Sequence, residues 1–419
     1  MIEKFFRMKI ITTAILVIFW LSFSAINFWA SLPKIADGFA NDLAKESQHD
    51  FWGNGKAYID KLSFHLNENV YKRYAFVEVY GFIQRFLGKN EENNFEVVMD
   101  EQGMAHYQYF GKNGDVDHSL AKRVAQLKDY TQPKTKIMAI VPPEKDIEGY
   151  TTYQRGLPNG YYNQKADNYL QDLAENQVDA LDLRPALSKS GIEPNEVFFK
   201  TDHHWRVETA FWAYKELAIC LQQKYGFVVD PFYMDKENWN FLTYDAVYLG
   251  SMGRKTGMYY SGVDDITLIY PKFNTKYELR MEYTKDLVLN PSGRFEETLL
   301  SYVPFRNGID PFNTYYDKYA SYMSGDYRLI HIVNEENPTG PKVLFIKDSI
   351  ARPTAAFLST MCSEVWLLDP RYYDDSMEEF ISTHELDYIF VMFLPQDITS
   401  DFFPFGKTDN TVDSSIGEN

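Results

Sequence analysis

Lys342-Val343-Leu344-Phe345-Ile346-Lys347-Asp348-Ser349 is the segment that decides the fold class. Its apolar run is typical of a short buried strand. The residues after Ser349 can begin a helix near Pro353, because proline favours the first helical turn. A strand followed directly by a helix predicts an α/β fold, in which the chemistry lies at the carboxyl ends of the strands. We therefore predict that the Ser349 hydroxyl and backbone N–H face a substrate.

The rest of the chain repeats this alternation on both sides of a long interruption. Strands are predicted at 136–141, 178–183, 343–346, 364–368 and 388–393, and helices at 163–175, 206–225, 353–360 and 376–384. Such alternation predicts a parallel sheet with helices on both faces. Residues 228–340, rich in Tyr, Asn, Gly and Pro, are predicted as an inserted β and loop region between the two halves of the sheet. A hairpin is predicted over 95–110, with its turn near Asp100–Gly103.

The densest cluster of catalytic residue types is Thr201-Asp202-His203-His204-Trp205. It lies between the strand-like run Val197–Phe199 and the helix predicted from residue 206. A single histidine is usually structural, but residues i and i+2 of an extended backbone point the same way. The Asp202 carboxylate can therefore hold His204 Nδ1 and leave Nε2 free to accept a proton from a nucleophile. Ser349 is the predicted nucleophile.

Thr201–Trp205 together with Lys347-Asp348-Ser349-Ile350 resembles the DHHW family, which is related to the extracytoplasmic alginate O-acetyltransferase subunits and, more distantly, to SGNH hydrolases. Those relatives use an Asp-x-His pair and a distant serine as a triad. The resemblance implies an SGNH-hydrolase-like catalytic domain over residues 55–400, with Asp202, His204 and Ser349 as its catalytic residues. Further stretches that resemble the family are 141–145, 250–257 and 368–373.

The function that the resemblance implies is O-acetylation of an exported polysaccharide. Ser349 would carry the acetyl group, and a polysaccharide hydroxyl would receive it. A membrane-bound O-acyltransferase partner would supply the donor, and no cofactor is implied. The chain departs from the SGNH pattern at one position, because Lys347 stands where a glycine usually precedes the Asp-Ser pair.

Further residues near these motifs are candidates for contact with the substrate: His203, Arg254, Thr256 and Lys145. Gly250–Gly257 mixes Gly, Lys and Thr, but its spacing differs from that of a P-loop and no helix is predicted after it. It is predicted as a tight turn that lines the cleft. Candidates for a second donor to an oxyanion are Asn334 and tyrosines of the insertion.

Three alternative functions remain open from the sequence. The same triad could hydrolyse acetyl esters. The Asp-His-His run could bind a metal with His203 as a ligand, as in phosphoesterases of the DHH type. That class needs additional aspartates at the ends of strands, and Asp179 and Asp182 provide only a weak D-x-x-D motif. The domain could also be a non-catalytic partner that binds polysaccharide. We prefer the interpretation of Asp202, His204 and Ser349 as a catalytic triad, and no metal site is predicted.

The N-terminus predicts a membrane anchor. Ile10–Ala30 is a 21-residue run without charge, preceded by Lys4, Arg7 and Lys9. This bias places the N-terminus in the cytoplasm and the remaining chain outside, as a single-pass protein of the cell membrane. A cleaved signal peptide is the alternative, because residues 29–31 offer a small-residue site. We predict an anchor over residues 1–31, a linker over 32–54, helices within 55–87 and a disordered tail over 401–419.

Composition restricts the partners. The net charge of −17 argues against nucleic acid and anionic membrane surfaces, since both repel an acidic protein. The cysteines are Cys220 and Cys362, which either pair in an oxidising compartment or serve as small buried apolar residues.

Overall fold

The computed structural model describes residues 2–45, 55–108, 117–306 and 314–405. The chain divides into two compact units, Met1–Gly81 and Phe82–Asn419. The second unit contains the α/β sheet and all the predicted site residues.

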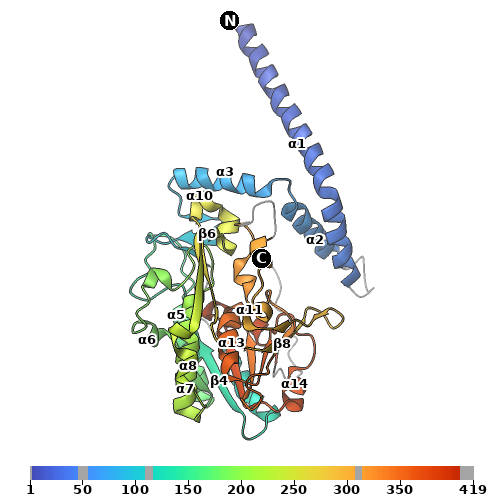
Figure 1. Ribbon diagram of the computed structural model, residues 1–419. Helices are drawn as coiled ribbons and strands as arrows, with labels where there is room; N and C mark the ends of the chain where they lie inside the picture. Colours follow the sequence, from blue (N-terminus) through green and yellow to red (C-terminus); the bar gives the residue numbers. More distant parts are fainter. Residues whose placement is uncertain (1, 46–54, 109–116, 307–313, 406–419) are drawn as a thin grey trace. The chain divides into compact units, whose positions relative to one another are not determined.

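The first unit consists of helices. It contains α1 (Ile2–Lys45), α2 (Gly55–Glu68) and most of α3 (Arg73–Phe86), as Figure 1 shows. Within α1, Lys9–Ala40 is long and apolar enough to cross a membrane, and it is the one such helix among the described residues. The predicted linker differs from the structure, because α1 continues through residue 45 despite Pro33. Residues 46–54 of that linker lie outside the described residues.

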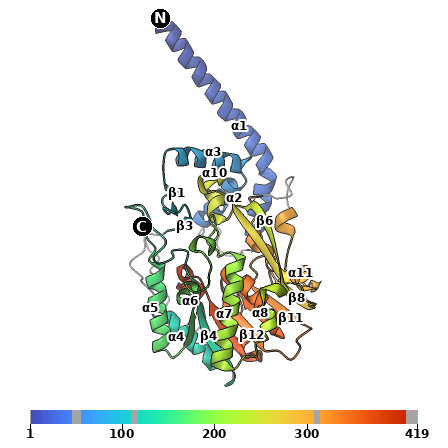
Figure 2. The same cartoon turned by 60° about the vertical axis from the view of Figure 1, so that its left-hand side comes forward.

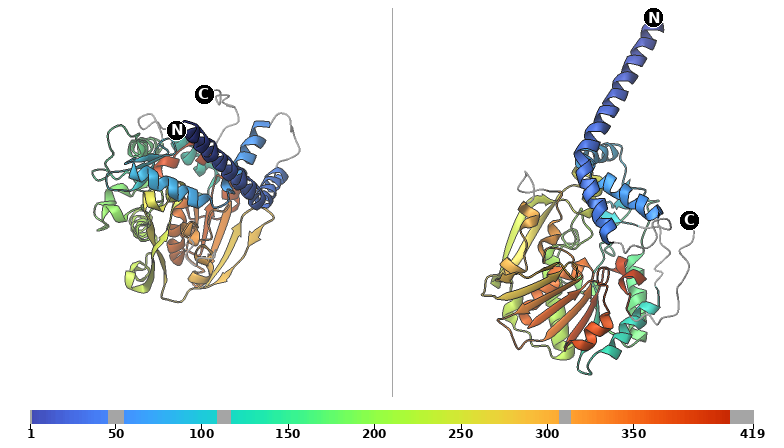
Figure 3. Two further views of the ribbon diagram at one scale, coloured as in Figure 1. Left: turned by 90° about the horizontal axis from the view of Figure 1, so that it is seen from above. Right: turned by 90° about the vertical axis from the view of Figure 1, so that its right-hand side faces the viewer.

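The second unit is built on a mixed sheet of nine strands, with the order β10-β8-β11-β13-β12-β14-β4-β5 and β9 beside β8. The strands are visible side by side in the right-hand view of Figure 3. The predicted parallel part is β4 (Lys136–Val141), β5 (Asp179–Asp182), β12 (Lys342–Lys347), β13 (Glu364–Leu368) and β14 (Tyr388–Met392). All five strands were predicted from their apolar runs.

Helices cover both faces of this sheet, as predicted (Figures 1 and 2). Along β12, Val343 and Phe345 pack into one core cluster while Leu344 and Ile346 pack into the other, because successive side chains of a strand alternate between faces. The first cluster includes α7 (Val207–Tyr225) and α13 (Arg352–Leu358). The second includes α4 (Ser119–Gln126), α5 (Tyr162–Glu175) and α14 (Met377–Thr383).

The predicted insertion contributes to the central sheet. Its strands β8 (Tyr277–Glu282), β10 (Ser292–Gly293) and β11 (Leu329–Asn334) extend the sheet in antiparallel fashion, and β9 (Val288–Leu289) pairs with β8. The parallel sheet was predicted, but the inserted region was expected to lie between its two halves, whereas its strands extend one side of the sheet. The remaining strands of this region, β6 (Trp239–Tyr248) and β7 (Asp264–Pro271), form a separate antiparallel pair.

Smaller elements complete the unit. The predicted hairpin is confirmed by β2 (Val97–Met99) and β3 (Ala105–Tyr107), which β1 (Glu91–Glu92) joins. The short helices are α6 (Arg184–Leu187), α8 (Pro231–Met234), α9 (Ser251–Thr256), α10 (Met258–Ser261), α11 (Phe295–Thr298) and α12 (Val303–Arg306). The 3-10 helices are Leu127–Tyr130, Pro194–Glu196, Lys236–Asn238, Lys318–Ser321, Ser349–Ala351, Ser359–Met361, Pro395–Asp397 and Ser400–Phe402.

The beginning of the predicted tail is packed. Phe403 and Phe405 are buried, and Arg123 Nη1 donates a hydrogen bond of 2.6 Å to the Phe403 carbonyl. Burial of these rings outweighs the entropy that a free tail would keep, so disorder from residue 401 was a wrong expectation. Residues 406–419 lie outside the described residues. Cys220 and Cys362 are both free thiols, so they do not form a disulfide.

Candidate active site

The segment between Val197 and Arg206 is a tight hairpin-like loop. Phe198 bridges Trp205, the Phe199 N–H donates to the His204 carbonyl at 3.2 Å, and the Arg206 N–H donates to the Val197 carbonyl at 2.9 Å. Val197–Phe199 was expected to be a strand. Among the described residues, its backbone pairs in β fashion with residues 204–206 of the same loop, and it does not join a sheet. The loop leads directly into α7 and presents Asp202, His203 and His204 together.

Two buried charged side chains hold this loop. Lys145 Nζ donates to the carbonyls of Phe199, Lys200 and Asp202 at 2.7, 3.1 and 2.8 Å. Asp264, on β7, accepts from the backbone N–H of Lys200 and from both the N–H and the hydroxyl of Thr201. An ammonium has three N–H donors, so Lys145 has none left over. The structure therefore gives Lys145 a supporting position in place of the predicted contact with substrate, and burial lowers its pKa to about 8.

Asp202, His204 and Ser349 form a continuous chain of hydrogen bonds. His204 Nδ1 lies 2.5 Å from Asp202 Oδ1, and His204 Nε2 lies 2.6 Å from Ser349 Oγ. An ionised carboxylate can only accept, so His204 Nδ1 carries the proton and Nε2 accepts from the serine hydroxyl. Burial alone would raise the pKa of Asp202, but the neighbouring His204 and His203 hold it well below its ordinary value. The pair is thus poised to take a proton from Ser349.

The glycine-rich stretch after β6 fixes Asp202. Ser251 donates its backbone N–H to Asp202 Oδ2 at 2.5 Å, and a Cβ on Gly250 would lie 2.2 Å from Asp202 Cβ. Only glycine therefore lets this backbone approach the carboxylate so closely. The prediction of a tight turn with no helix after it was wrong, because residues 251–256 form α9 and Met258–Ser261 form α10. The sequence motif was noticed, but its contact with Asp202 is a tertiary feature.

The other predicted substrate contacts have partners within the protein. Thr256 is buried, and its hydroxyl donates to the Met252 carbonyl at 3.0 Å. Arg254 Nη1 donates to the Leu249 carbonyl at 3.1 Å. His203 Nδ1 lies 3.0 Å from the Ser251 hydroxyl, and burial together with the adjacent His204 lowers its pKa to about 3. Thr256 and Arg254 thus stabilise α9 and its entry, while His203, partly exposed, lies beside Asp202 and His204.

Sequence reasoning missed Tyr319. Its ring stacks on His204 with ring centroids 3.8 Å apart and an angle of 17°. Its hydroxyl accepts from Trp205 Nε1 at 3.1 Å and donates to the Ile350 carbonyl at 3.2 Å. Tyr319 therefore connects the histidine loop with the serine turn. Among the many tyrosines of the insertion, no local pattern distinguishes it.

Ser349 follows Asp348 at the end of β12, at the carboxyl edge of the parallel strands. It is the first residue of a 3-10 helix, so its backbone N–H has no partner within that helix and is a candidate oxyanion donor. Asp348 fixes the turn by accepting from the N–H groups of Ile350 and Leu394 at 2.9 and 2.7 Å. Burial, and then the nearby Asp397, raise the pKa of Asp348 to about 8.

Lys347, which stands in place of the usual glycine, has a buried ion-pair network. Its Nζ lies 2.8 Å from Asp326 Oδ1 and 3.0 Å from Asp369 Oδ2, and its side chain is fully buried. Arg371 joins the same network through Asp369 at 2.6 Å. Lys347 thus holds the end of β12, the strand that leads to Ser349.

Asn334 is not an oxyanion donor. Its Nδ2 donates to the carbonyls of Ser359 and Thr360. The preceding residue, Val333, pairs with Glu364 at the start of β13, so Asn334 lies at the opposite edge of the sheet from Ser349. The sequence could not reveal this, because the direction of β11 is set by tertiary pairing.

One group of potential metal ligands occurs among the described residues, namely Asp202, His203 and His204. Both ring nitrogens of His204 already face Asp202 and Ser349. This arrangement matches a proton relay better than a metal site, which would require a ring nitrogen of His204 to turn away from one of these partners.

Comparison with known proteins supports the fold. Residues 110–241 match the family model described as SGNH hydrolase-like domain, acetyltransferase AlgX. The chain carries an SGNH hydrolase-like domain. The resemblance predicted from the sequence is thereby confirmed, and the matched segment includes the Asp202–His204 loop. No curated protein was found that matches the chain in sequence.

Solved structures share the fold of this SGNH-like domain. A DHHW family protein from Eubacterium siraeum DSM 15702 superposes with a TM-score of 0.56 at 16% identity, covering 74% of this chain and 94% of that one. PatB1 of Bacillus cereus superposes with a TM-score of 0.59 at 16% identity, covering 74% and 99%. A structure of the same PatB1 with a sulfonyl adduct gives 0.60 and 16%, covering 74% and 98%.

Proposed function

We propose that this protein is an extracytoplasmic O-acetyltransferase that moves an acetyl group through an acyl-Ser349 intermediate onto hydroxyls of an exported polysaccharide. The observation that carries the proposal is the chain of hydrogen bonds from Asp202 through His204 to Ser349. The match of residues 110–241 to an acetyltransferase family model agrees with it.

In the first step, Ser349 Oγ attacks the carbonyl carbon of the acetyl donor while His204 Nε2 takes the hydroxyl proton. The Asp202 carboxylate holds the imidazole and stabilises the imidazolium that forms. When the tetrahedral intermediate collapses, His204 returns the proton to the leaving group of the donor. The acetyl group then remains as an ester on Ser349.

In the second step, a polysaccharide hydroxyl gives its proton to His204 Nε2 and attacks the acetyl-serine. The ester bond to Ser349 breaks, and the serine oxygen regains the proton from His204. Water in place of the acceptor would turn the same residues into an esterase. Transfer and hydrolysis therefore differ only in which hydroxyl reaches the acyl-enzyme.

The N-terminal helix agrees with a membrane location. Lys9–Ala40 is long and apolar enough to span a bilayer, and Lys4 and Arg7 precede it. This bias favours a cytoplasmic N-terminus and an external SGNH-like domain. The acetyl donor would then come from a membrane-bound O-acyltransferase partner, since acetyl donors made inside the cell must cross the membrane.

Covalent labelling tests the proposal directly. The full-length chain in neutral detergent is exposed briefly to an activated acetyl ester, and its intact mass and peptide masses are measured beside Ser349→Ala and His204→Ala. We expect one acetyl group on Ser349 in the wild type and none in either variant. Added oligosaccharides then distinguish transfer from hydrolysis by whether the acetyl group appears on sugar or as free acetate. A wild type that neither acquires the label nor turns over the ester would contradict the proposal.

A sulfonyl fluoride provides a second probe, because PatB1 of similar fold has been solved with a sulfonyl adduct. A sulfonyl group on Ser349, absent from His204→Ala, would agree with a serine activated by that histidine. If the reagent labels His204→Ala equally, the serine is merely accessible.

A further inference from the structure

The helix α3 carries its large apolar side chains on the outside. They recur with the i, i+3, i+4, i+7 spacing of one helical face, and all are exposed: Phe76, Val79, Tyr80, Ile83, Phe86 and Leu87, which follows the last residue of α3. We call this face the α3 stripe. Phe86 is 81% exposed and Val79 is 61% exposed, whereas Gly81 and Gln84 on another face are buried. A helix on the surface of a soluble protein usually has the reverse arrangement, so the stripe indicates a contact with an apolar partner.

The beginning of α3 is attached to the helix that is long enough to span a membrane. The ring of Phe76 lies edge-on to the ring of Phe23 in α1, with centroids 5.3 Å apart. In the turn before α3, the Tyr71 N–H donates to Asn27 Oδ1 at 3.3 Å. Asn27 is the one carboxamide in the apolar run 10–30, and the structure uses it to hold this turn.

The position of Phe23 along α1 sets the depth of this attachment. With the N-terminus in the cytoplasm, as proposed above, Ala30 is at the outer end of the apolar run, and Phe23 precedes it by seven residues. At 1.5 Å per residue, Phe23 lies about 10 Å below that end. Helices that lie in the plane of a membrane bury their apolar face to a similar depth, roughly 5–10 Å. The beginning of α3 is therefore held at the level of the lipid headgroups and the first acyl carbons.

Basic residues lie at both ends of α3. Residues 71–90 contain four basic residues and one acidic residue, in a chain whose net charge is −17; the basic residues are Lys72, Arg73, Arg85 and Lys89. Long basic side chains beside an apolar face can extend to lipid phosphates while their methylene groups stay on the apolar surface. Zwitterionic headgroups offer these phosphates without the net negative charge that would repel the rest of the chain.

The other end of α3 is fixed within the SGNH-like domain. The ring of Phe82 lies edge-on to the exposed ring of Tyr259 in α10, with centroids 6.3 Å apart. Gly257 alone separates α10 from α9, whose Ser251 N–H donates to Asp202. A contact between the α3 stripe and lipid would therefore restrain the SGNH-like domain in addition to the restraint by α1.

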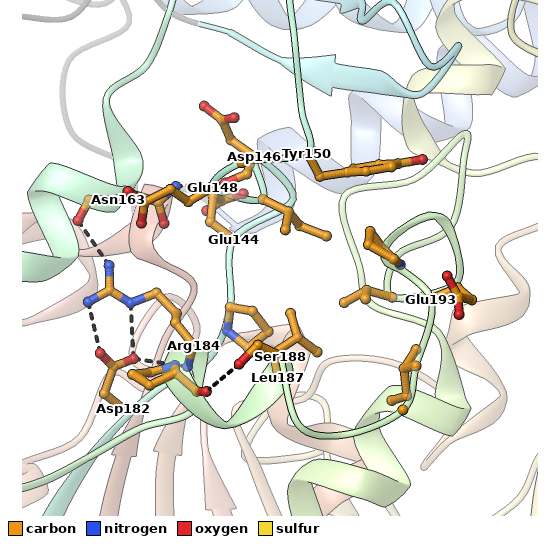
Figure 4. A pocket seen from close by; sticks show the side chains of 18 of the residues that line it. Glu144, Asp146, Glu148, Tyr150, Asn163, Asp182, Arg184, Leu187, Ser188 and Glu193 are labelled. Carbon is orange, nitrogen blue, oxygen red and sulfur yellow. Dashed lines mark hydrogen bonds and ion pairs between the residues drawn. The ribbon is translucent and has the colours of Figure 1, made fainter.

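A second copy of the chain suits the stripe less well than lipid does. The pocket of about 890 Å³ beside β4 and β5 is large enough to receive phenyl rings. Carboxyl groups line it, however, as Figure 4 shows for Asp146, Glu148 and Glu193. Covering carboxylates with apolar rings removes their water without supplying a hydrogen bond, which is costly. Acyl chains receive the same rings without this cost.

We propose that α3 is an interfacial helix whose stripe lies in the outer leaflet of a zwitterionic bilayer and gives the SGNH-like domain a second attachment to the membrane. The inference rests on the membrane location proposed for α1, and it is independent of the acyl-serine chemistry.

Labelling from the lipid phase tests the proposal. The full-length chain is reconstituted into phosphatidylcholine vesicles that contain a small share of a phosphatidylcholine with a diazirine in its acyl chain. After irradiation, peptide mass spectrometry locates the residues that the carbene has modified. We expect labels on α1 and on Ile83, Phe86 and Leu87 of the stripe. Val228, which is 87% exposed and lies between α7 and α8, is the internal control and should carry no label.

A double variant tests the stripe itself. Ile83→Gln with Phe86→Gln removes two apolar side chains, and glutamine favours a helix, so α3 should persist. Both side chains are exposed, and the rest of the fold should therefore be unaffected. Labelling of the remaining stripe residues should fall about tenfold or more, whereas labelling of α1 should not change. Val228→Gln is the matched control and should alter neither. Undiminished labelling of α3 in the double variant would overturn the role of the stripe.

The pattern of labels distinguishes this inference from the proposed function. Labels on α1 without labels on α3 would overturn the inference and assign the stripe to a protein partner or a second copy. Labels on neither helix would overturn the membrane anchor and the inference together. Ser349→Ala should be labelled as the wild type is. Labelling of α3 in a wild type that acquires no acetyl group on Ser349 would contradict the proposed chemistry and leave the inference standing.

Discussion

His204 Nε2 lies 2.6 Å from Ser349 Oγ, although 145 residues separate the two in the chain. The contact forms because the Asp202 loop and the turn after β12 meet at one edge of the sheet. Tyr319 supports it by stacking on His204 while bonding to the backbone of Ile350.

The first prediction concerns the two ends of the hydrogen-bonded chain, Ser349 and Asp202. Replacing Ser349 by alanine removes the nucleophile, and we expect acetyl transfer to fall by at least about 10⁴-fold. Asp202→Asn leaves the shape intact but allows the wrong imidazole tautomer, and a fall of about 10⁴-fold in kcat is expected. Steady-state kinetics with an activated acetyl ester measure both. Near-wild-type rates in Asp202→Asn would show that His204 needs no orienting carboxylate.

The second prediction concerns Gly250. A methyl group there would meet Asp202 Cβ at 2.2 Å, so Gly250→Ala must displace the carboxylate. We expect a loss of about 1–3 kcal/mol in the free energy of unfolding and roughly 10²-fold in kcat. Gly88→Ala is the control, because no atom lies within 4 Å of its added Cβ and its cost comes only from the positive φ of 76°. That variant should lose stability but keep its rate.

The third prediction separates two roles of Tyr319. Tyr319→Phe keeps the ring on His204 but leaves the buried Trp205 Nε1 without its acceptor, which should cost about 1–3 kcal/mol of stability with little change in kcat. Tyr319→Leu removes the ring as well, so kcat should fall further, and the cavity left by the fully buried ring should add to the loss of stability. Chemical denaturation and ester kinetics measure the two quantities. If both variants lose the same activity, the hydroxyl matters more than the stack.

The fourth prediction is a dependence of stability on pH that originates at Glu144. Burial raises its pKa to about 7 from its ordinary value of 4.5. Between these values the folded state binds more protons than the unfolded state, so stability falls as pH rises and is lowest above pH 7. Glu144→Gln mimics the protonated acid, and at pH 8 its free energy of unfolding should exceed that of the wild type by roughly 3 kcal/mol.

At pH 4 the two proteins of this comparison should differ little. The measurement is the midpoint of urea unfolding at both pH values, with Asp129→Asn as the control. A constant difference between wild type and Glu144→Gln at all pH values would mean that Glu144 titrates normally.

The fifth prediction concerns Lys347. Lys347→Met leaves the buried Asp369 and the partly buried Asp326 without one of their cations, and a loss of about 3–5 kcal/mol of stability is expected. Lys342→Met at the other end of the same strand is the matched control, because its ion pair with Glu364 is partly exposed and should be worth about 1 kcal/mol or less. Equal losses of stability in the two variants would show that burial of the ion-pair network does not increase its contribution to stability.

The sequence alone determined the elements of the parallel sheet and predicted the three residues, Asp202, His204 and Ser349, that the structure joins by hydrogen bonds. Apolar runs such as Lys342–Lys347 specify buried strands locally, and the i, i+2 spacing of Asp202 and His204 specifies which side chains share a direction. Local patterns also indicated the N-terminal apolar helix. These inferences hold because neighbouring residues interact over short distances along the chain.

Only the tertiary structure decided the rest. The pairing of β11 with β13 and β8, the approach of Gly250 to Asp202 and the stack of Tyr319 on His204 depend on contacts between residues far apart in sequence. The same holds for Lys145, whose charge suggested a substrate contact but whose three donors serve the Asp202 loop. A side chain's role depends on which partners satisfy its donors, charge and volume, and the fold supplies those partners.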